Sequence, residues 1–168
     1  DAFTGRVKWS HAFVDGHTQE TTNIGEDGTI YTIRQPSSST AFTIYAFNPD
    51  GSVKWTSETF DPPGSVSIYA YGPVLDYQDD LYVNCEIRGT NTGYLVKINH
   101  TDGTTTWKYK TGDVASFPIV GPDNTVYTAN SSYNQEVPKN IFAINPDGTL
   151  KWKYELGKSA RANFFFDN

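Results

Sequence analysis

The sequence predicts an all-β protein built from a repeated unit of four short strands. Runs of alternating apolar and polar residues, rich in β-branched and aromatic side chains, are separated by tight turns with Asp-Gly or Pro-Asp-Gly sequences. No segment shows the 3.6-residue period of an amphipathic helix. Four tryptophans, each placed shortly after a turn, recur at intervals of 46, 52 and 45 residues. A fixed period of this length is the signature of a repeat architecture.

The four strands of the unit follow one another in a constant order. A less regular first strand opens each unit, in residues 21–25, 72–75 and 117–121. After a turn, the second strand carries a tyrosine at a fixed place, which is Tyr31, Tyr82 or Tyr127. The third strand ends in asparagine, in residues 44–48, 95–99 and 141–145. A second turn leads to the fourth strand and its tryptophan, at Trp55, Trp107 or Trp152, and residues 5–9 match this last part of the unit.

Such a unit cannot bury both of its faces alone, whereas radial stacking of several units buries them, which predicts a β-propeller of four-stranded antiparallel blades. The four tryptophans would occupy equivalent places on the outermost strands and pack against neighbouring blades. The predicted boundaries give the end of a blade, three complete blades and the first strand of the next blade: 1–19, 20–64, 65–113, 114–158 and 159–168. Closed propellers have 4–8 blades. We therefore expect the rest of a longer propeller chain, or a second copy of this one, to complete the ring.

The pattern Ile-x-Ala-x-Asn-x-Asp-Gly-x-x-x-Trp, complete in residues 141–152, resembles the PQQ-like repeat. That resemblance covers nearly the whole chain. It implies the propeller of quinoprotein alcohol dehydrogenases, or of secreted and lipoprotein relatives that bind no quinone, such as the scaffold subunit of the outer-membrane protein assembly machine. Many quinone-binding members carry two adjacent cysteines, a calcium ligand set and a catalytic aspartate. Cys85 is alone here and no matching acid cluster is present, so we expect a member without a cofactor.

Composition excludes several classes of function. The net charge of −6 disfavours binding to a phosphate backbone, and we expect no nucleic-acid partner. No apolar run approaches the roughly 20 residues of a membrane helix, so we expect no membrane span. A single cysteine forms neither an internal disulfide nor a multi-cysteine metal site.

Two features favour a secreted or extracytoplasmic protein. The chain starts at Asp1 without methionine or an apolar leader, which indicates a removed leader or a piece of something longer. Asn99 and Asn130 head the N-x-[ST] triplets of glycosylation sites and are predicted on exposed turns or loops, although such triplets also arise by chance in a chain rich in Asn, Thr and Ser.

No catalytic residue is predicted. None of the three histidines, His11, His17 and His100, lies in a recognisable catalytic motif. The adjacent carboxylates Asp79 and Asp80 raise calcium or acid–base chemistry, but they occupy the turn position of 27–28 and 123–124, where an aspartate caps its own turn.

Surface and channel residues are therefore the candidates for binding. The loops between second and third strands differ most from unit to unit, which on a repeated scaffold indicates drift or binding. Aromatic side chains of the innermost strands would line a central channel and stack on sugar rings, or else pack between blades: Tyr69, Tyr71, Phe117 and Phe164. The predicted function is a non-catalytic scaffold that binds a protein or a glycan. The alternatives are a fragment of a PQQ-dependent dehydrogenase and a fragment of a carbohydrate-active propeller enzyme.

Overall fold

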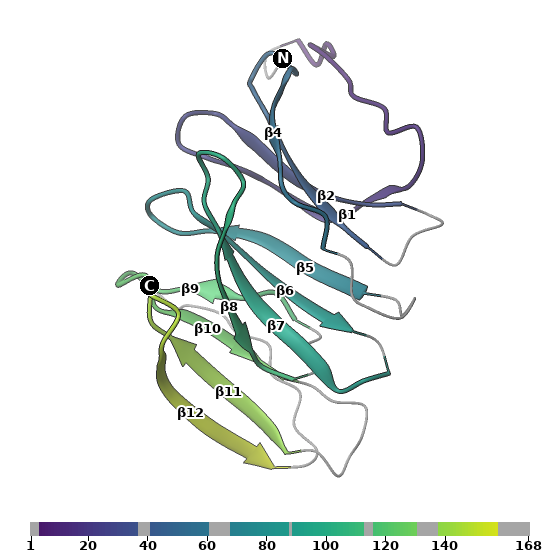
Figure 1. Ribbon diagram of the computed structural model, residues 1–168. Coiled ribbons are helices and arrows are strands. Elements are labelled where there is room, and N and C mark those ends of the chain that lie inside the picture. The colour runs from purple at the N-terminus through teal and green to yellow at the C-terminus, as the bar shows by residue number, and fades with distance from the viewer. Residues whose placement is uncertain are drawn as a thin grey trace.

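The computed structural model describes residues 4–36, 41–60, 68–87, 89–112, 116–130 and 138–157. These residues form three antiparallel sheets of four strands each, and in every sheet the strands lie side by side in chain order (Figure 1). The all-β prediction and its four-stranded blades are thereby confirmed. None of the described residues belongs to a helix that could cross a membrane.

Each sheet is one up-and-down meander. The first sheet consists of β1 (His17–Ile24), β2 (Ile30–Gln35), β3 (Thr43–Phe47) and β4 (Val53–Thr56). The second consists of β5 (Ile68–Leu75), β6 (Leu81–Ile87), β7 (Thr92–Ile98) and β8 (Thr105–Lys110). The third consists of β9 (Ile119–Val120), β10 (Val126–Ala129), β11 (Lys139–Ile144) and β12 (Leu150–Gly157).

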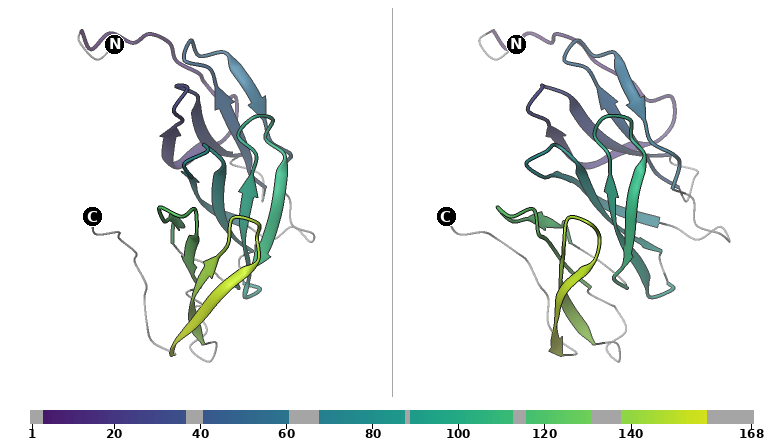
Figure 2. Two further views of the ribbon diagram at one scale, coloured as in Figure 1. Left: turned by 90° about the vertical axis from the view of Figure 1, so that its left-hand side faces the viewer. Right: turned by 60° about the vertical axis from the view of Figure 1, so that its left-hand side comes forward.

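The sheets are stacked in chain order and splay apart from their first strands, as blades do (Figure 2). The first strands are neighbours in space, since β1 contacts β5 and β5 contacts β9. The first and third sheets lie at opposite ends of the stack, so that the described residues form an open array rather than a closed ring (Figure 2).

The second sheet is covered on both faces, because successive side chains of a strand point to opposite sides. In β6, Leu81 and Val83 pack into the cluster shared with the first sheet, while Tyr82 packs into the cluster shared with the third. All three side chains are fully buried. The core of the protein is therefore a pair of inter-sheet layers, not one central cluster.

Two details differ from the sequence prediction. The strands β1 and β5 each begin four residues earlier than predicted, and β5 pairs with β6 from Ile68 onward, with a bulge between Tyr71 and Val74. The predicted outermost strand before Trp9 does not form: residues 4–16 belong to no strand. Strand geometry needs a hydrogen-bonded neighbour, and no described strand pairs with this segment. The strand predicted at 159–168 lies outside the described residues.

Candidate functional site: the junctions between blades

Three of the four tryptophans dock on the β-turn of the following unit. The indole Nε1 of Trp9 donates a hydrogen bond to the carbonyl oxygen of Pro49 at 3.0 Å. Trp55 donates in the same way to His100 at 2.8 Å, and Trp107 to Pro146 at 3.0 Å. Each accepting residue follows the asparagine that ends the third strand, so the three contacts are equivalent. The expectation that the tryptophans pack against neighbouring blades is confirmed for these three.

The indole rings also lie flat against the glycines of the same turns. A Cβ atom added to Gly51 would lie 2.6 Å from Trp9, one added to Gly103 2.6 Å from Trp55, and one added to Gly148 2.8 Å from Trp107. All three glycines have positive φ, which side chains rarely adopt. Glycine is therefore required both by the turn and by the ring upon it.

The docked indoles of Trp55 and Trp107 also contact the repeat's tyrosine within their own sheets. The ring centroids of Tyr31 and Trp55 are 5.8 Å apart, and those of Tyr82 and Trp107 are also 5.8 Å apart. The third-sheet pair, Tyr127 and Trp152, repeats the same distance of 5.8 Å. Tyrosine, tryptophan and turn glycine thus form one layered joint, whose first two members come from one blade and whose third comes from the next.

The turns that receive the indoles are held rigid by their own aspartates, as predicted. Asp50 accepts a hydrogen bond from the Ser52 amide at 2.9 Å and one from its hydroxyl at 2.6 Å. Asp102 and Asp147 bond Thr104 and Thr149 in the same manner. These hydrogen bonds lower the pKa of all three aspartates.

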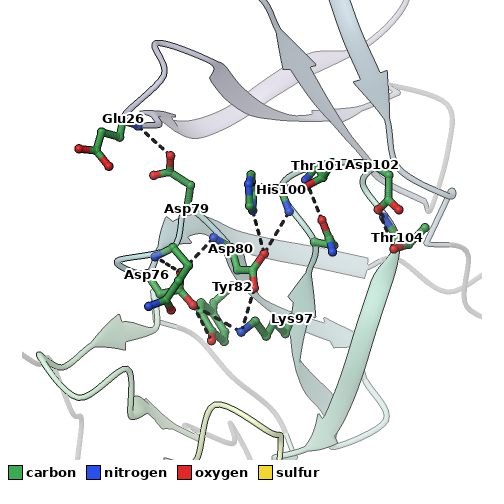
Figure 3. A network of polar contacts seen from close by, with 12 residues as sticks. Glu26, Asp76, Asp79, Asp80, Tyr82, Lys97, His100, Thr101, Asp102 and Thr104 are labelled. Carbon is green, nitrogen blue, oxygen red and sulfur yellow. Dashed lines mark hydrogen bonds and ion pairs between the residues drawn. The ribbon is translucent and has the colours of Figure 1, made fainter.

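A partly buried polar cluster, which we call the Asp80 cluster, connects two turns of the second sheet (Figure 3). Its members are Asp76, Asp80, Tyr82, Lys97 and His100. The Lys97 ammonium lies 3.0 Å from Asp80 Oδ2 and 3.4 Å from Asp76 Oδ2, and the Tyr82 hydroxyl donates to Asp76 at 3.1 Å. His100 contacts Asp80 twice, through Nδ1 at 3.1 Å and through its backbone amide at 3.2 Å. The cluster fixes the turn whose His100 carbonyl accepts the Trp55 indole.

The charges of the cluster stabilise one another in spite of burial. Burial by itself would raise the pKa of Asp80, but the hydrogen bonds from His100 and Lys97 outweigh it and hold this pKa below its ordinary value. Burial would lower the pKa of Lys97, but Tyr82 and Asp80 raise it. Burial also raises the pKa of Tyr82 to about 12. Lys97 therefore stays an ammonium ion and is no nucleophile at neutral pH.

The first and third sheets use a different lysine for the same purpose. Lys54 bonds Asp27 and Thr29 at 2.9 Å each, and in the third sheet Lys151 bonds Asp123 and Thr125 at 2.8 and 2.9 Å. Both lysines lie on the fourth strand of their units, where the second sheet has Thr106. Lys97 instead replaces the alanine found at 46 and 143 in the third strands. In the second sheet, the lysine that bonds the aspartates of the first turn therefore lies on the third strand instead of the fourth.

The turn 76–80 corrects the prediction for Asp79 and Asp80. Asp76 caps this turn, accepting from the amides of Gln78 at 2.8 Å and Asp80 at 3.0 Å. Asp79 instead leaves its own turn and accepts from the Glu26 amide of the first sheet at 2.9 Å (Figure 3). The prediction was one residue out of register, since Asp79 shares its positive φ with Gly28 and Asn124. Sequence reasoning missed Asp76 and Lys97; the alanine-to-lysine change in the repeat was the available signal.

The order carboxylate, imidazole, hydroxyl at Asp80, His100 and Thr101 superficially resembles a hydrolase triad. The Thr101 hydroxyl lies 3.5 Å from His100 Nε2, beyond the roughly 2.6–3.2 Å typical of a nucleophile and its base. Asp80 is also engaged by Lys97. This geometry serves to hold the turn.

Three of the four predicted channel residues lie on or next to a first strand. Tyr69 and Tyr71 are half-buried on β5, and Phe117 is half-buried just before β9. The rings of Tyr71 and Phe117 meet edge to face, with centroids 5.9 Å apart. Phe164 lies outside the described residues. The contact joins the second and third sheets, and a ligand-binding role for these aromatics stays a prediction.

The two predicted glycosylation sites differ in their surroundings. Asn99 opens the β7–β8 turn, is half-buried, and accepts from the Thr101 amide at 2.7 Å. Asn130 is only 6% exposed and accepts from the Asn140 amide at 2.5 Å. The expectation of an exposed loop is therefore wrong for Asn130, because its side chain substitutes for a backbone partner next to β11. Glycosylation itself stays a prediction.

Cys85 is buried, and burial raises the pKa of its thiol to about 12. The prediction of a small buried apolar residue is confirmed. Among the described residues, no group of three or more His, Cys, Asp and Glu side chains could hold a metal ion.

The fold and its joints define a PQQ-like repeat protein with propeller blades. Residues 1–165 match the sequence family described as outer membrane protein assembly factor BamB, and the chain belongs to that family. No individual curated protein matches it significantly.

Proposed function

We propose that this chain is a non-catalytic, extracytoplasmic propeller segment that serves as a protein-binding scaffold. The observation that carries the proposal is the contrast between the two ends of the strands. At one end lie short turns of nearly constant length: 25–29, 76–80 and 121–125 between first and second strands, and 48–52, 99–104 and 145–149 between third and fourth strands. At the other end, the connections between second and third strands have unequal lengths: 36–42, 88–91 and 130–138.

At the end with turns of constant length, the turns make the contacts that hold neighbouring blades together. These turns carry the tryptophan docks, the Asp80 cluster and the Asp79 contact described above. Side chains that hold one blade to the next are not free to adapt to a ligand. Within the described parts of the connections at the variable end, no equivalent joint recurs from sheet to sheet, and loops on a rigid scaffold are the usual place for recognition. The family's description as an assembly factor supports a protein rather than a small molecule as the ligand.

Site-specific photo-crosslinking in the cell envelope tests this proposal. A photoreactive residue replaces Thr90, exposed in the β6–β7 connection, and in the matched control it replaces Tyr77, exposed in the tight turn 76–80. We expect discrete protein adducts from position 90 and none from position 77. Adducts of equal yield at both positions, or none at either, would contradict a protein-binding role for the variable end. Fractionation of the same cells locates the chain outside or inside the cytoplasm.

A further inference from the structure

The junction between the second and third sheets contains a buried amide at a position that the first sheet fills with an apolar side chain. Asn84 of β6 stands two residues after the repeat tyrosine, where the first sheet has Ile33. Ile33 is fully buried in the apolar cluster between the first and second sheets. Asn84 is fully buried as well, but its amide makes hydrogen bonds to residues that follow the second sheet in the chain.

Both protons of the Asn84 amide nitrogen are used. Nδ2 donates to the carbonyl oxygen of Ser116, just before β9, at 2.8 Å, and to the hydroxyl of Thr128 in β10, also at 2.8 Å. A carbonyl oxygen only accepts hydrogen bonds, so the nitrogen and not the oxygen of the amide must face Ser116. The hydrogen-bond network therefore fixes the orientation of the amide and leaves Oδ1 as an acceptor outside these two bonds.

Two buried oxygen atoms at this junction have no hydrogen-bond partner among the described residues. They are Asn84 Oδ1 and Ser116 Oγ. Their residues are joined by the bond from Asn84 Nδ2 to the Ser116 carbonyl, so both oxygens belong to one local network. Buried polar groups in folded proteins nearly always pair with the protein or with an ordered water. This pair of oxygens therefore indicates a bound hydrogen-bond donor.

The size and chemistry of the site select the donor. Oδ1 requires a donor, whereas the Ser116 hydroxyl can donate or accept. Tyr71 lies directly opposite Asn84 in the β5–β6 ladder, and its ring meets the ring of Phe117, the residue after Ser116, edge to face. A ligand of more than a few atoms does not reach a fully buried amide beside these rings. The asparagine side chain is shorter than the isoleucine at the matching position, which leaves space for a water molecule.

We propose that an ordered water binds between Asn84 Oδ1 and Ser116 Oγ and links the second sheet to the segment that leads into β9. The water donates one proton to Asn84 Oδ1 and forms its second hydrogen bond with the Ser116 hydroxyl. Asn84 then holds the junction through three hydrogen bonds, two from its nitrogen and one to its oxygen. The inference goes beyond the proposed scaffold function and does not depend on which molecule the scaffold binds.

A crystal structure at a resolution that shows ordered waters tests the proposal directly. We expect a water at roughly 2.7–3.2 Å from both oxygen atoms. Ser116→Ala is expected to lower the occupancy of this water, and the variant keeps both Asn84 Nδ2 bonds because one of them uses the Ser116 backbone carbonyl. The matched control Ser116→Thr retains the hydroxyl and is expected to retain the water. A direct hydrogen bond between Ser116 Oγ and Asn84 Oδ1, a protein donor on Oδ1, or a dry site overturns the proposal.

Oxygen-17 relaxation dispersion of water tests the same site in solution, because its amplitude reports long-lived internal waters. Asn84→Ile, which introduces the residue found in the first sheet, is expected to lower this amplitude, and Ser116→Thr is expected to leave it unchanged. Near-UV circular dichroism of the aromatic side chains shows whether each variant keeps its fold. An unchanged amplitude in a folded Asn84→Ile variant contradicts the proposal, and the Ser116→Ala crystal structure decides the question if Asn84→Ile does not fold.

Discussion

Substitution of Gly103 by alanine isolates the contact between a tryptophan and the turn of the next blade. Gly103 and Gly89 both have a φ of +76°, but a Cβ on Gly103 would lie 2.6 Å from Trp55, whereas a Cβ on Gly89 would meet nothing within 4 Å. The left-handed backbone costs alanine about 1–2 kcal/mol at either position. Overpacking adds about 1–3 kcal/mol at Gly103 alone. We therefore expect Gly103→Ala to lower the free energy of unfolding by about 2–5 kcal/mol and Gly89→Ala by about 1–2 kcal/mol.

Urea unfolding followed by tryptophan fluorescence measures both losses. The comparison is valid if the slope of free energy against urea stays constant among the variants. A Trp55→Ala background supplies the decisive control, because without the indole the difference between the two glycine variants should largely vanish. Equal losses for Gly103→Ala and Gly89→Ala in the original background would show that the indole does not constrain the turn, and the joint as described would be incorrect.

Three further outcomes are expected. Trp107→Ala, which removes a docked indole, should cost about 3 kcal/mol or more, whereas Trp152→Ala, at a side chain that is 43% exposed, should cost clearly less in the same urea assay; the reverse order would argue against the docking contact. Lys97→Met removes the only cation near Asp76 that the described residues supply and leaves Asp80 with His100 alone, and should cost about 3 kcal/mol. Lys54→Met at an exposed ion pair should cost at most about 1 kcal/mol, and similar losses in thermal unfolding would contradict the importance of burial. Because the folded-state pKa of Asp80 lies below its ordinary value of 3.8, its contribution to stability is present above that pH and is lost as the pH falls through the folded-state pKa; urea titrations at stepwise lower pH should show a smaller loss in Asp80→Asn than in the original chain.

The strands and their order were predictable because their signals are local. Period-2 alternation, Asp-Gly turns and the recurring tyrosine and tryptophan each act within a few residues, and the repeat presents them three times. The same local rules explain why Tyr31 and Tyr82 are buried and why Asp50 caps its turn.

The joints between blades were only partly predictable. Sequence placed Trp55 on an outer strand, but its acceptor, the His100 carbonyl, lies 45 residues further along the chain. The Asp80 cluster joins residues of two turns and two strands. Its lysine, Lys97, stands where the other two units have alanine, so the repeat pattern did not predict its role.

The sequence by itself determined the class of fold, the number of complete four-stranded units and the burial of Cys85. Only the tertiary structure decided which carboxylate caps the turn 76–80, that Asn130 is buried, and that the turns with Gly51, Gly103 and Gly148 each receive a tryptophan, while none of the described glycines lies against Trp152. The physical reason is that a hydrogen bond or a ring contact depends on atoms brought together by the stacking of whole sheets. The neighbours of a residue along the chain do not indicate which blade packs against its side chain.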